Sequence, residues 1–275
     1  MHKSILPNEW YGMFRYARLW ISFFKNCLAR EIEFRAHFIL YFLVDVAWYG
    51  VQIALFEVLF LYTPSIGGLS KNDMTIFLGT LFIVDGINMM MISTNFWRFP
   101  HYVTSGELDF YVIKPVSPFF MVFFRYANIG SCLNLLTAVA FLIYGLQGSD
   151  ITLSVGMIAL YLLMIVSGTV ILLSMQAAMA AISIFLVNAE GVQHIFHALY
   201  QFAMKPDSIY GKTARRMFLT AFPMALIASV PARVLYDDTL SPLLILWQLG
   251  ASLIFIIISA RFFNWSLKYY TGASS

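Results

Sequence analysis

Three side chains, Glu190, His194 and His197, have types and spacing that could bind a metal ion. They stand at positions i, i+4 and i+7, so a helix would place them on one face. A complete tetrahedral site needs further ligands, and no cysteine or second histidine pair lies nearby in the sequence. The pattern therefore favours polar residues, Glu190 and His194 among them, that face a subunit interface or an aqueous mouth. A metal-dependent enzyme embedded in the membrane is the alternative.

Four ionisable side chains lie inside long apolar segments, at Asp45, Glu57, Asp85 and Arg125. Ionisable groups within a bilayer are costly and are candidates for functional sites. Glu57 lies near one end of its segment, and Arg125 lies close enough to an end to extend its charge to the membrane surface. Asp45, Asp85 and Arg125 are therefore candidates for a transport pathway or a subunit interface. The alternatives for the two aspartates are structural hydrogen bonds, or ion sites in an ion-coupled secondary transporter or channel.

Sequence motifs of common enzymes are missing from the chain. It has no glycine-rich phosphate loop followed by Lys and Ser/Thr, no nucleophile elbow and no zinc-protease helix. We therefore expect the chain itself to bind no ATP or other cofactor and to catalyse no reaction. The net charge of +3 is too small to indicate a nucleic-acid partner.

The composition predicts an all-α, polytopic membrane protein. Hydrophobic residues make up 60% of the 275 residues and charged residues 11%, whereas globular domains are about 45–50% apolar and about 25% charged. A helix needs roughly 20 apolar residues to cross the bilayer. Six segments are the candidate spans: 38–62, 74–96, 119–146, 151–187, 191–204 and 243–263.

The region 151–238 is the least regular part of this pattern. Residues 151–187 carry no charge. The segment is longer than one membrane-spanning helix needs and shorter than two helices with a turn need. One long helix fits the segment, and so does a helix broken near residues 174–176. Residues 191–204 are too few to span the bilayer alone. Residues 205–238 are polar and contain three prolines.

Residues 1–36 form a separate N-terminal segment before the transmembrane domain, 37–275. Within it, residues 9–31 place basic side chains on one helical face and aromatic ones on another, which is typical of a helix lying on a membrane surface. Six Lys and Arg residues precede the first span, one follows it, and two lie in the next loop. The positive-inside rule then places both termini and residues 98–118 in the cytoplasm. The basic residues of 205–216 fall on the outer side, against the rule.

A polar island, residues 98–118, separates the second and third spans. Thr104 and Glu107 have the spacing of a capping box, and Glu107 and Asp109 place negative charge at the start of a helix. Lys114 and Pro115 mark its end. The island therefore predicts a helix of about ten residues, exposed outside the bilayer, that a partner protein could contact. An ordinary interfacial loop is the alternative.

The sequence Gly106-Glu107-Leu108-Asp109, followed by Lys114-Pro115-Val116-Ser117-Pro118 and Arg125, resembles the cytoplasmic motif of bacterial ABC type-2 permeases. Residues 205–210, 219–225 and 231–232 resemble the re-entrant outer hairpin of the same family. The resemblance covers nearly the whole chain. The family's usual proline-tyrosine pair before the hairpin is here Lys205-Pro206, which leaves the start of the hairpin undefined.

The resemblance implies a role for each part of the chain. The 98–118 loop would hold the coupling helix, which contacts a separate ATP-binding subunit. Residues 151–187 would be a long fourth helix, 191–204 a short fifth helix, and 205–238 the hairpin. The chain would be the permease subunit of an exporter in the bacterial inner membrane, paired with an identical or homologous permease subunit. The residues implied in ATPase coupling are Ser105, Gly106, Glu107, Leu108, Asp109, Lys114 and Pro115.

Overall fold

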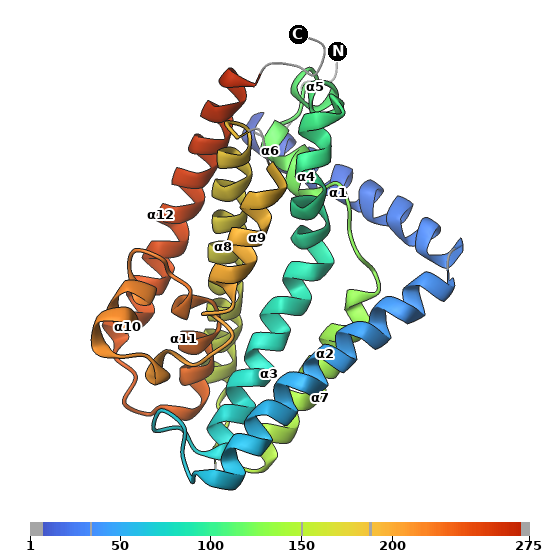
Figure 1. Ribbon diagram of the computed structural model, residues 1–275. Coiled ribbons are helices and arrows are strands. Elements are labelled where there is room, and N and C mark those ends of the chain that lie inside the picture. The colour runs from blue at the N-terminus through green and yellow to red at the C-terminus, as the bar shows by residue number, and fades with distance from the viewer. Residues whose placement is uncertain (1–7, 34, 150, 187–188, 271–275) are drawn as a thin grey trace.

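The computed structural model describes residues 8–33, 35–149, 151–186 and 189–270, and within them every regular element is a helix (Figure 1). The all-α prediction is therefore confirmed. The elements are α1 Asn8–Glu33, α2 Arg35–Tyr62, α3 Lys71–Asn88, η1 Met89–Ser93, α4 Thr94–Thr104, α5 Glu107–Val112, α6 Pro118–Phe124, α7 Ser131–Gln147, α8 Val155–Ser183, α9 Ala189–Tyr200, η2 Asp207–Ile209, α10 Lys212–Leu219, α11 Ala225–Tyr236, α12 Pro242–Ser266 and η3 Leu267–Tyr269.

Four helical stretches in the described part of the chain are long and apolar enough to cross a membrane: Phe42–Tyr62, Lys71–Thr104, Val155–Ser183 and Pro242–Tyr269. Two further apolar helices, α7 and α11, are shorter. The α3–α4 stretch, α8 and α12 run toward one end of the bundle, and α2 and α7 run away from it (Figure 1). One end, which we call the α5 end, carries the last turn of α4 together with α5 and α6. The chain is a multi-pass membrane protein.

The helices pack through small residues. A side chain on Gly79 of α3 would place its Cβ 2.8 Å from the Cα of Leu142 on α7. A Cβ on Gly168 of α8 would lie 2.4 Å from the backbone oxygen of Ile227 on α11. Lipid tails are as apolar as the helix surfaces, so association depends on such close contact rather than on expulsion of water. The two glycines therefore set how closely α3 approaches α7 and α8 approaches α11.

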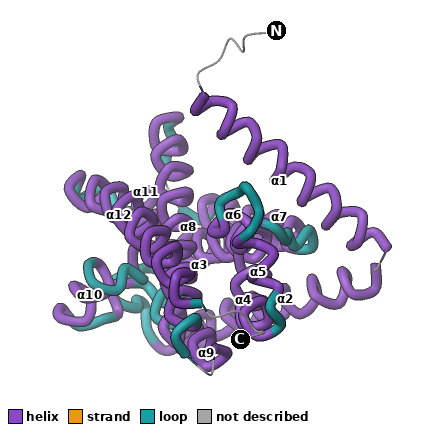
Figure 2. Tube along the Cα trace, turned by 90° about the horizontal axis from the view of Figure 1, so that it is seen from above, coloured by secondary structure: helices purple, strands orange, loops and turns teal. Residues whose placement is uncertain are grey.

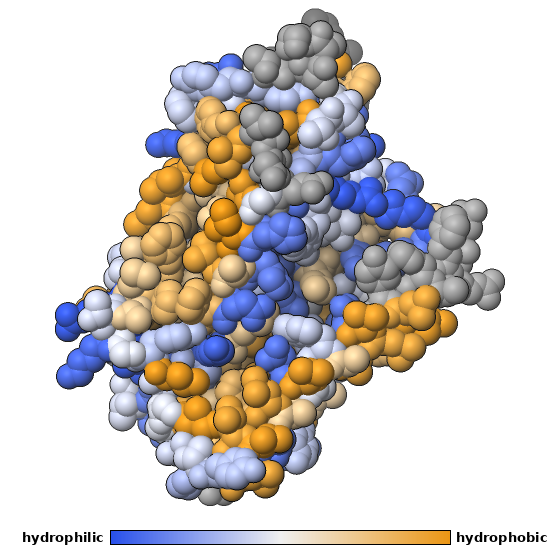
Figure 3. All heavy atoms as spheres, viewed as in Figure 1, coloured by the Kyte–Doolittle hydropathy of each residue, from blue (hydrophilic) through white to orange (hydrophobic). Residues whose placement is uncertain are grey.

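Helices α1 and α2 form an arm beside this bundle. Viewed from above, they lie at one side of the molecule, with α9 and α10 elsewhere on its perimeter (Figure 2). The outer surface of α2 is apolar and lies open beside the more hydrophilic surface of α1 (Figure 3). Its exposed large apolar side chains are Ile39, Leu40, Leu43, Val44, Val51, Leu55, Val58 and Leu59.

The structure differs from the expected elements in two places. The second helical rod ends at Thr104 rather than at residue 96, because polar side chains extend the helix beyond its apolar part, although Pro100 within it donates no backbone hydrogen bond. The expected third helix, 119–146, is divided into α6 and α7 by a non-helical connection, residues 125–130. Non-helical backbone at this depth is tolerated where protein groups satisfy it, and those groups come from distant parts of the sequence.

The region 151–238 contains one long helix, α8, one short helix, α9, and then a group of short helices. α8 is continuous through residues 174–176, so a break there is excluded. α9 contains 12 residues, and the segment after it holds η2, α10 and α11.

Candidate functional site

The predicted coupling segment is a six-residue helix, α5, displayed at the α5 end of the bundle (Figure 1). Gly106 precedes it with a φ of 75°, a left-handed conformation that costs glycine little and other residues more. The expected capping box is absent, because Thr104 belongs to the last turn of α4 and its hydroxyl donates to the carbonyl of Pro100 at 3.1 Å. The predicted ten-residue helix is therefore shorter, and a glycine turn rather than a side-chain cap begins it.

The inner face of α5 is fixed to the bundle. Leu108 and Tyr111 are buried. The Tyr111 hydroxyl donates to the Glu107 carboxylate at 2.6 Å, and the Arg125 guanidinium donates to the same hydroxyl and lies 3.5 Å from that carboxylate. Burial, and then the bond to Glu107, raise the pKa of Tyr111 well above its usual value. Glu107 therefore points inward and joins α5 to the 125–130 connection.

The outer face of α5 is apolar as well as acidic. Phe110 is 63% exposed and Ile113 is 77% exposed. The Asp109 side chain makes no hydrogen bond or ion pair with any residue that the structure describes. Sequence reasoning had selected the acidic residues and missed Phe110 and Ile113. Their exposure follows from the burial of Leu108 and Tyr111, which fixes the rotation of the short helix.

Ser105, Lys114 and Pro115 lie at the two ends of α5. The Ser105 hydroxyl donates to the carbonyl of His101 at 2.6 Å and so belongs to the end of α4. Lys114 is exposed, with its Nζ 5.9 Å from the Tyr111 ring centre. The carbonyl of Pro115 accepts a hydrogen bond from Arg15 of α1 at 2.9 Å. The predicted coupling residues are thus brought together, but only part of the set faces outward.

Helix α1 lies against the chain that follows α5. The Tyr16 hydroxyl accepts from the backbone N–H of Ser117 at 3.1 Å. The Glu31 carboxylate accepts from the backbone N–H groups of Ile129 and Gly130 at 3.1 and 3.0 Å. These donors precede α7, where a helix start leaves N–H groups without intrahelical partners. Glu31 therefore supplies the cap for α7 from 98 residues earlier in the sequence.

Helices α3 and α4, with the π-helical turn η1 between them, form one continuous rod, the α3–α4 rod. The 125–130 connection binds this rod at and just after η1. The backbone N–H of Asn128 donates to the carbonyl of Met90 at 2.9 Å. Asn95 binds Tyr126 twice, with its amide donating to the Tyr126 carbonyl at 2.7 Å and its oxygen accepting from the Tyr126 N–H at 2.9 Å. A π turn leaves carbonyls free of the regular ladder, and the connection uses one of them. The methionine run 89–91 of the sequence gave no sign of this.

The two buried aspartates have separate partners. Asp85 is 5% exposed and accepts from the hydroxyls of Tyr200 at 3.1 Å and Tyr49 at 3.5 Å. Asp45 is partly buried and accepts from the Asn134 amide. Asp85 thereby links α2, α3 and α9, and Asp45 links α2 to α7. Whether either residue also lines a pathway stays a prediction.

The residues first considered for a metal lie along α9. His194 is exposed, with its ring 6.3 Å from that of Trp97. His197 is exposed and bonds Gln201 at 3.1 Å. The Glu190 side chain lies outside the described residues. Among the described side chains, no three His, Cys, Asp or Glu residues gather closely enough to hold a metal ion.

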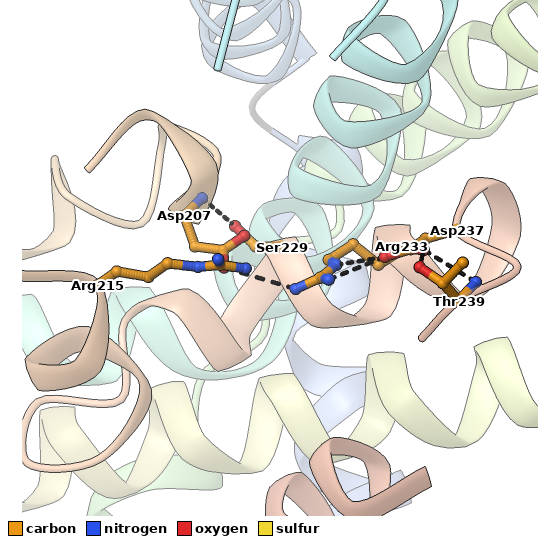
Figure 4. A network of polar contacts seen from close by, with 6 residues as sticks. All are labelled: Asp207, Arg215, Ser229, Arg233, Asp237 and Thr239. Atoms are coloured by element: carbon orange, nitrogen blue, oxygen red, sulfur yellow. Dashed lines mark hydrogen bonds and ion pairs between the residues drawn. The ribbon is translucent and has the colours of Figure 1, made fainter. Parts of the chain in front are cut away.

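A charged network stabilises the segment after α9 (Figure 4). Asp207 is 2% exposed, and its carboxylate lies 2.7 Å from Arg215 of α10 and 3.7 Å from Arg233 of α11. Arg233 also pairs with Asp237 at 2.8 Å. Partial burial acts to raise the pKa of Asp237, but bonds from Thr239 and Arg233 hold it below its usual value. The network joins η2, α10 and α11 into one unit.

The model of the family described as "ABC-2 family transporter protein" matches residues 46–274, which include α5 and the charged network but not α1. No curated protein and no solved structure gives a significant match.

Proposed function

The chain belongs to the ABC-2 family of transporter proteins, and from this premise we propose that it is the permease subunit of an ATP-driven exporter. A separate subunit would bind and hydrolyse ATP. Export direction, the bacterial inner membrane and a second permease subunit are parts of the proposal.

The observation that carries the proposal is the two-sided geometry of α5. Its outer face exposes Phe110 and Ile113, which suits an apolar groove on a partner protein. Its inner face is fixed by Leu108, Tyr111 and the Glu107–Arg125 pair. A helix that is free on one side and anchored on the other can pass a displacement from a partner to the bundle.

The same contacts suggest where such a displacement goes. A displacement of α5 would reach the 125–130 connection at its first residue, Arg125. The connection binds the α3–α4 rod at Met90 and Asn95 and binds α1 at Glu31. A partner that binds α5 differently in its ATP-bound and ATP-free states would then shift these helices together. The N-terminal surface helix α1 is thereby included in the coupling unit.

We propose six crossings with the α5 end in the cytoplasm and both termini on that side. α9 would be the short fifth crossing and η2, α10 and α11 the outer hairpin. The basic residues of the hairpin oppose the positive-inside rule. Two arginines of this segment, Arg215 and Arg233, are paired with the nearly buried Asp207, so they contribute little free positive charge to the outer side.

A second copy or a homologue would complete the pathway. In one chain, His194 and His197 of α9 are exposed, although the ring of His194 lies 6.3 Å from that of Trp97 on α4. Exposed polar side chains at membrane depth are costly unless they face protein or water. Two chains facing each other across this surface would enclose it, and Glu190 and His194 would then lie at the interface or the cytoplasmic mouth.

The test is assembly with the ATP-binding subunit. The permease should co-purify with an ATPase encoded beside it. The rate of ATP hydrolysis by that ATPase should change when the permease is bound. Phe110→Ala/Ile113→Ala should weaken assembly while leaving membrane insertion normal. Phe222→Ala, which removes a side chain 43% exposed near α10, is the control and should have no effect. Normal assembly of the double variant, or transport by the chain alone driven by an ion gradient, would refute the proposal.

A further inference from the structure

Three arginines from three different elements surround the ring of Tyr126. The ζ carbon of Arg98 on α4 lies 4.4 Å from the ring centre, that of Arg125 5.4 Å, and that of Arg30 on α1 5.5 Å. Since all three lie within 5.5 Å of one point, they are about a Debye length apart or less at 0.1 M salt, roughly 10 Å. Their charges therefore repel one another, and the ring only partly offsets this.

The nearby carboxylates do not neutralise this cluster. Arg125 has Glu107 at 3.5 Å. Arg30 and Arg98 have no ion-pair partner among the residues that the structure describes. Glu31, next to Arg30 in sequence, accepts from the N–H groups of Ile129 and Gly130, and with its charge counted the three arginines still face only two carboxylates, Glu31 and Glu107. The arginine cluster, Arg30, Arg98 and Arg125 around Tyr126, thus carries excess positive charge.

We propose that the arginine cluster binds the phosphate group of an anionic phospholipid in the leaflet at the α5 end. Guanidinium groups donate in a planar fork that matches phosphate oxygens, and two such groups from different helices can contact one headgroup. Bound phosphate would remove the repulsion between the arginines. It would also join α1 to α4 through a third component, in addition to the protein contacts described above.

The surrounding surface selects a lipid over free phosphate. Helix α2 follows α1 in the chain, and its first turns contribute exposed large apolar side chains to the hydrophobic patch at that side of the molecule (Figure 3). Ile39 is 53%, Leu40 62%, Leu43 54% and Val44 65% exposed. A phospholipid with its headgroup at the arginine cluster can lay its acyl chains along this face. Inorganic phosphate has no acyl chains and would gain no binding energy from this apolar face.

The experiment measures binding of phosphatidylglycerol and phosphatidylcholine, with the same acyl chains, to the purified full chain by native mass spectrometry and thermal stabilisation. We expect one phosphatidylglycerol to be retained preferentially. Arg30→Gln/Arg98→Gln should weaken its binding roughly 10- to 30-fold, the effect of removing two basic groups near an anionic lipid. Arg18→Gln removes an exposed arginine of α1 that contacts no described ring or carboxylate, and it should leave binding unchanged.

Equal retention of the two lipids by the wild-type chain would overturn the proposal without need of any variant. An equal loss in the Arg18 variant and the double variant would reduce the effect to general surface charge and would also overturn it. Inorganic phosphate, added in large excess, should not displace the lipid. If inorganic phosphate bound as tightly as phosphatidylglycerol, the arginine cluster would be a site for free phosphate, and the lipid proposal would be refuted. If the double variant does not purify, Arg98→Gln is compared with Arg18→Gln instead. Weaker phosphatidylglycerol binding in Arg98→Gln only supports the proposal, and equal binding in the two variants overturns it.

Discussion

Glu107 and Asp109, two residues apart on one short helix, should respond differently to the same substitution. Glu107 accepts from Tyr111 and pairs with Arg125, whereas Asp109 makes no side-chain hydrogen bond or ion pair within the described residues. We therefore predict that Glu107→Lys destabilises the chain itself. Asp109→Lys should leave its stability nearly intact and act on docking of the ATP-binding subunit.

The size of the difference follows from the contacts. A hydrogen bond to a charged group contributes about 1.5–3 kcal/mol, and the Tyr111–Glu107 bond at 2.6 Å belongs to this class. The Arg125–Glu107 pair is about one-third exposed on both sides, so we assign it about 0.2–1 kcal/mol. Lysine removes both and adds repulsion. The expected loss for Glu107→Lys is about 2–4 kcal/mol, or a decrease in Tm of about 5–15 °C. Asp109→Lys loses at most about 1 kcal/mol of helix-dipole interaction.

Thermal unfolding of the purified chain, followed by the fluorescence of its six tryptophans, measures this difference. The charge-swapped variant Glu107→Lys/Arg125→Glu should recover part of the lost stability, because it restores opposite charges in the pair. Equal decreases in Tm for the two single lysine variants would show that the inward contact of Glu107 contributes nothing. Failure of the swap to recover any stability, with Tyr111 unchanged, would assign the loss to other contacts.

Three further predictions concern packing, topology and the buried acids. Gly168→Ala should lower stability by about 1–3 kcal/mol because its Cβ would meet a backbone oxygen at 2.4 Å, whereas Gly250→Ala, with open space around it, should be neutral in thermal unfolding. In a cysteine-free background, Lys212→Cys should react with an impermeant thiol reagent from outside and Ser105→Cys from inside only; the reverse pattern would contradict the proposed topology. Asp85→Asn should reduce folding yield or turnover, since two buried tyrosines lose a charged acceptor, yet transport should still require ATP; loss of ion-driven transport would favour an ion-coupled carrier.

The helical content and the order of apolar segments could be predicted because they depend on local composition. A run of about 20 apolar residues must be helical in lipid whatever it contacts. The continuity of α8 and the shortness of α9 came from the family resemblance, because composition alone left both a single and a broken helix open. The position of α5 was also anticipated, since its turn residue Gly106 and its terminator Pro115 are local signals.

The contacts that position α5 could not be predicted, because their partners are far apart in sequence. Glu31 caps α7 across 98 positions, and Tyr16 binds Ser117 across 101. The acidic residues 107 and 109 look equivalent in the sequence. Only the burial of Leu108 and Tyr111 shows that one points inward and the other does not. For the same reason, the exposed Phe110 and Ile113 could not be distinguished from ordinary apolar residues.

The connection 125–130 explains how a short helix could move several long ones. The chain passes from α4 to α5 through the Gly106 turn, and the rings of Tyr102 on α4 and Tyr111 on α5 lie 5.3 Å apart between their centres. The 125–130 connection offers a second route, because its own backbone groups bind Asn95, Met90 and Glu31. A displacement of Arg125 by α5 would therefore reach the α3–α4 rod and α1 at once. A regular helix across these six residues would have used its N–H groups internally and left none to bind its neighbours. If α5 binds the ATP-binding subunit as proposed, the break in the third helix therefore gives it a route to α3, α4 and α1 that an unbroken helix would lack.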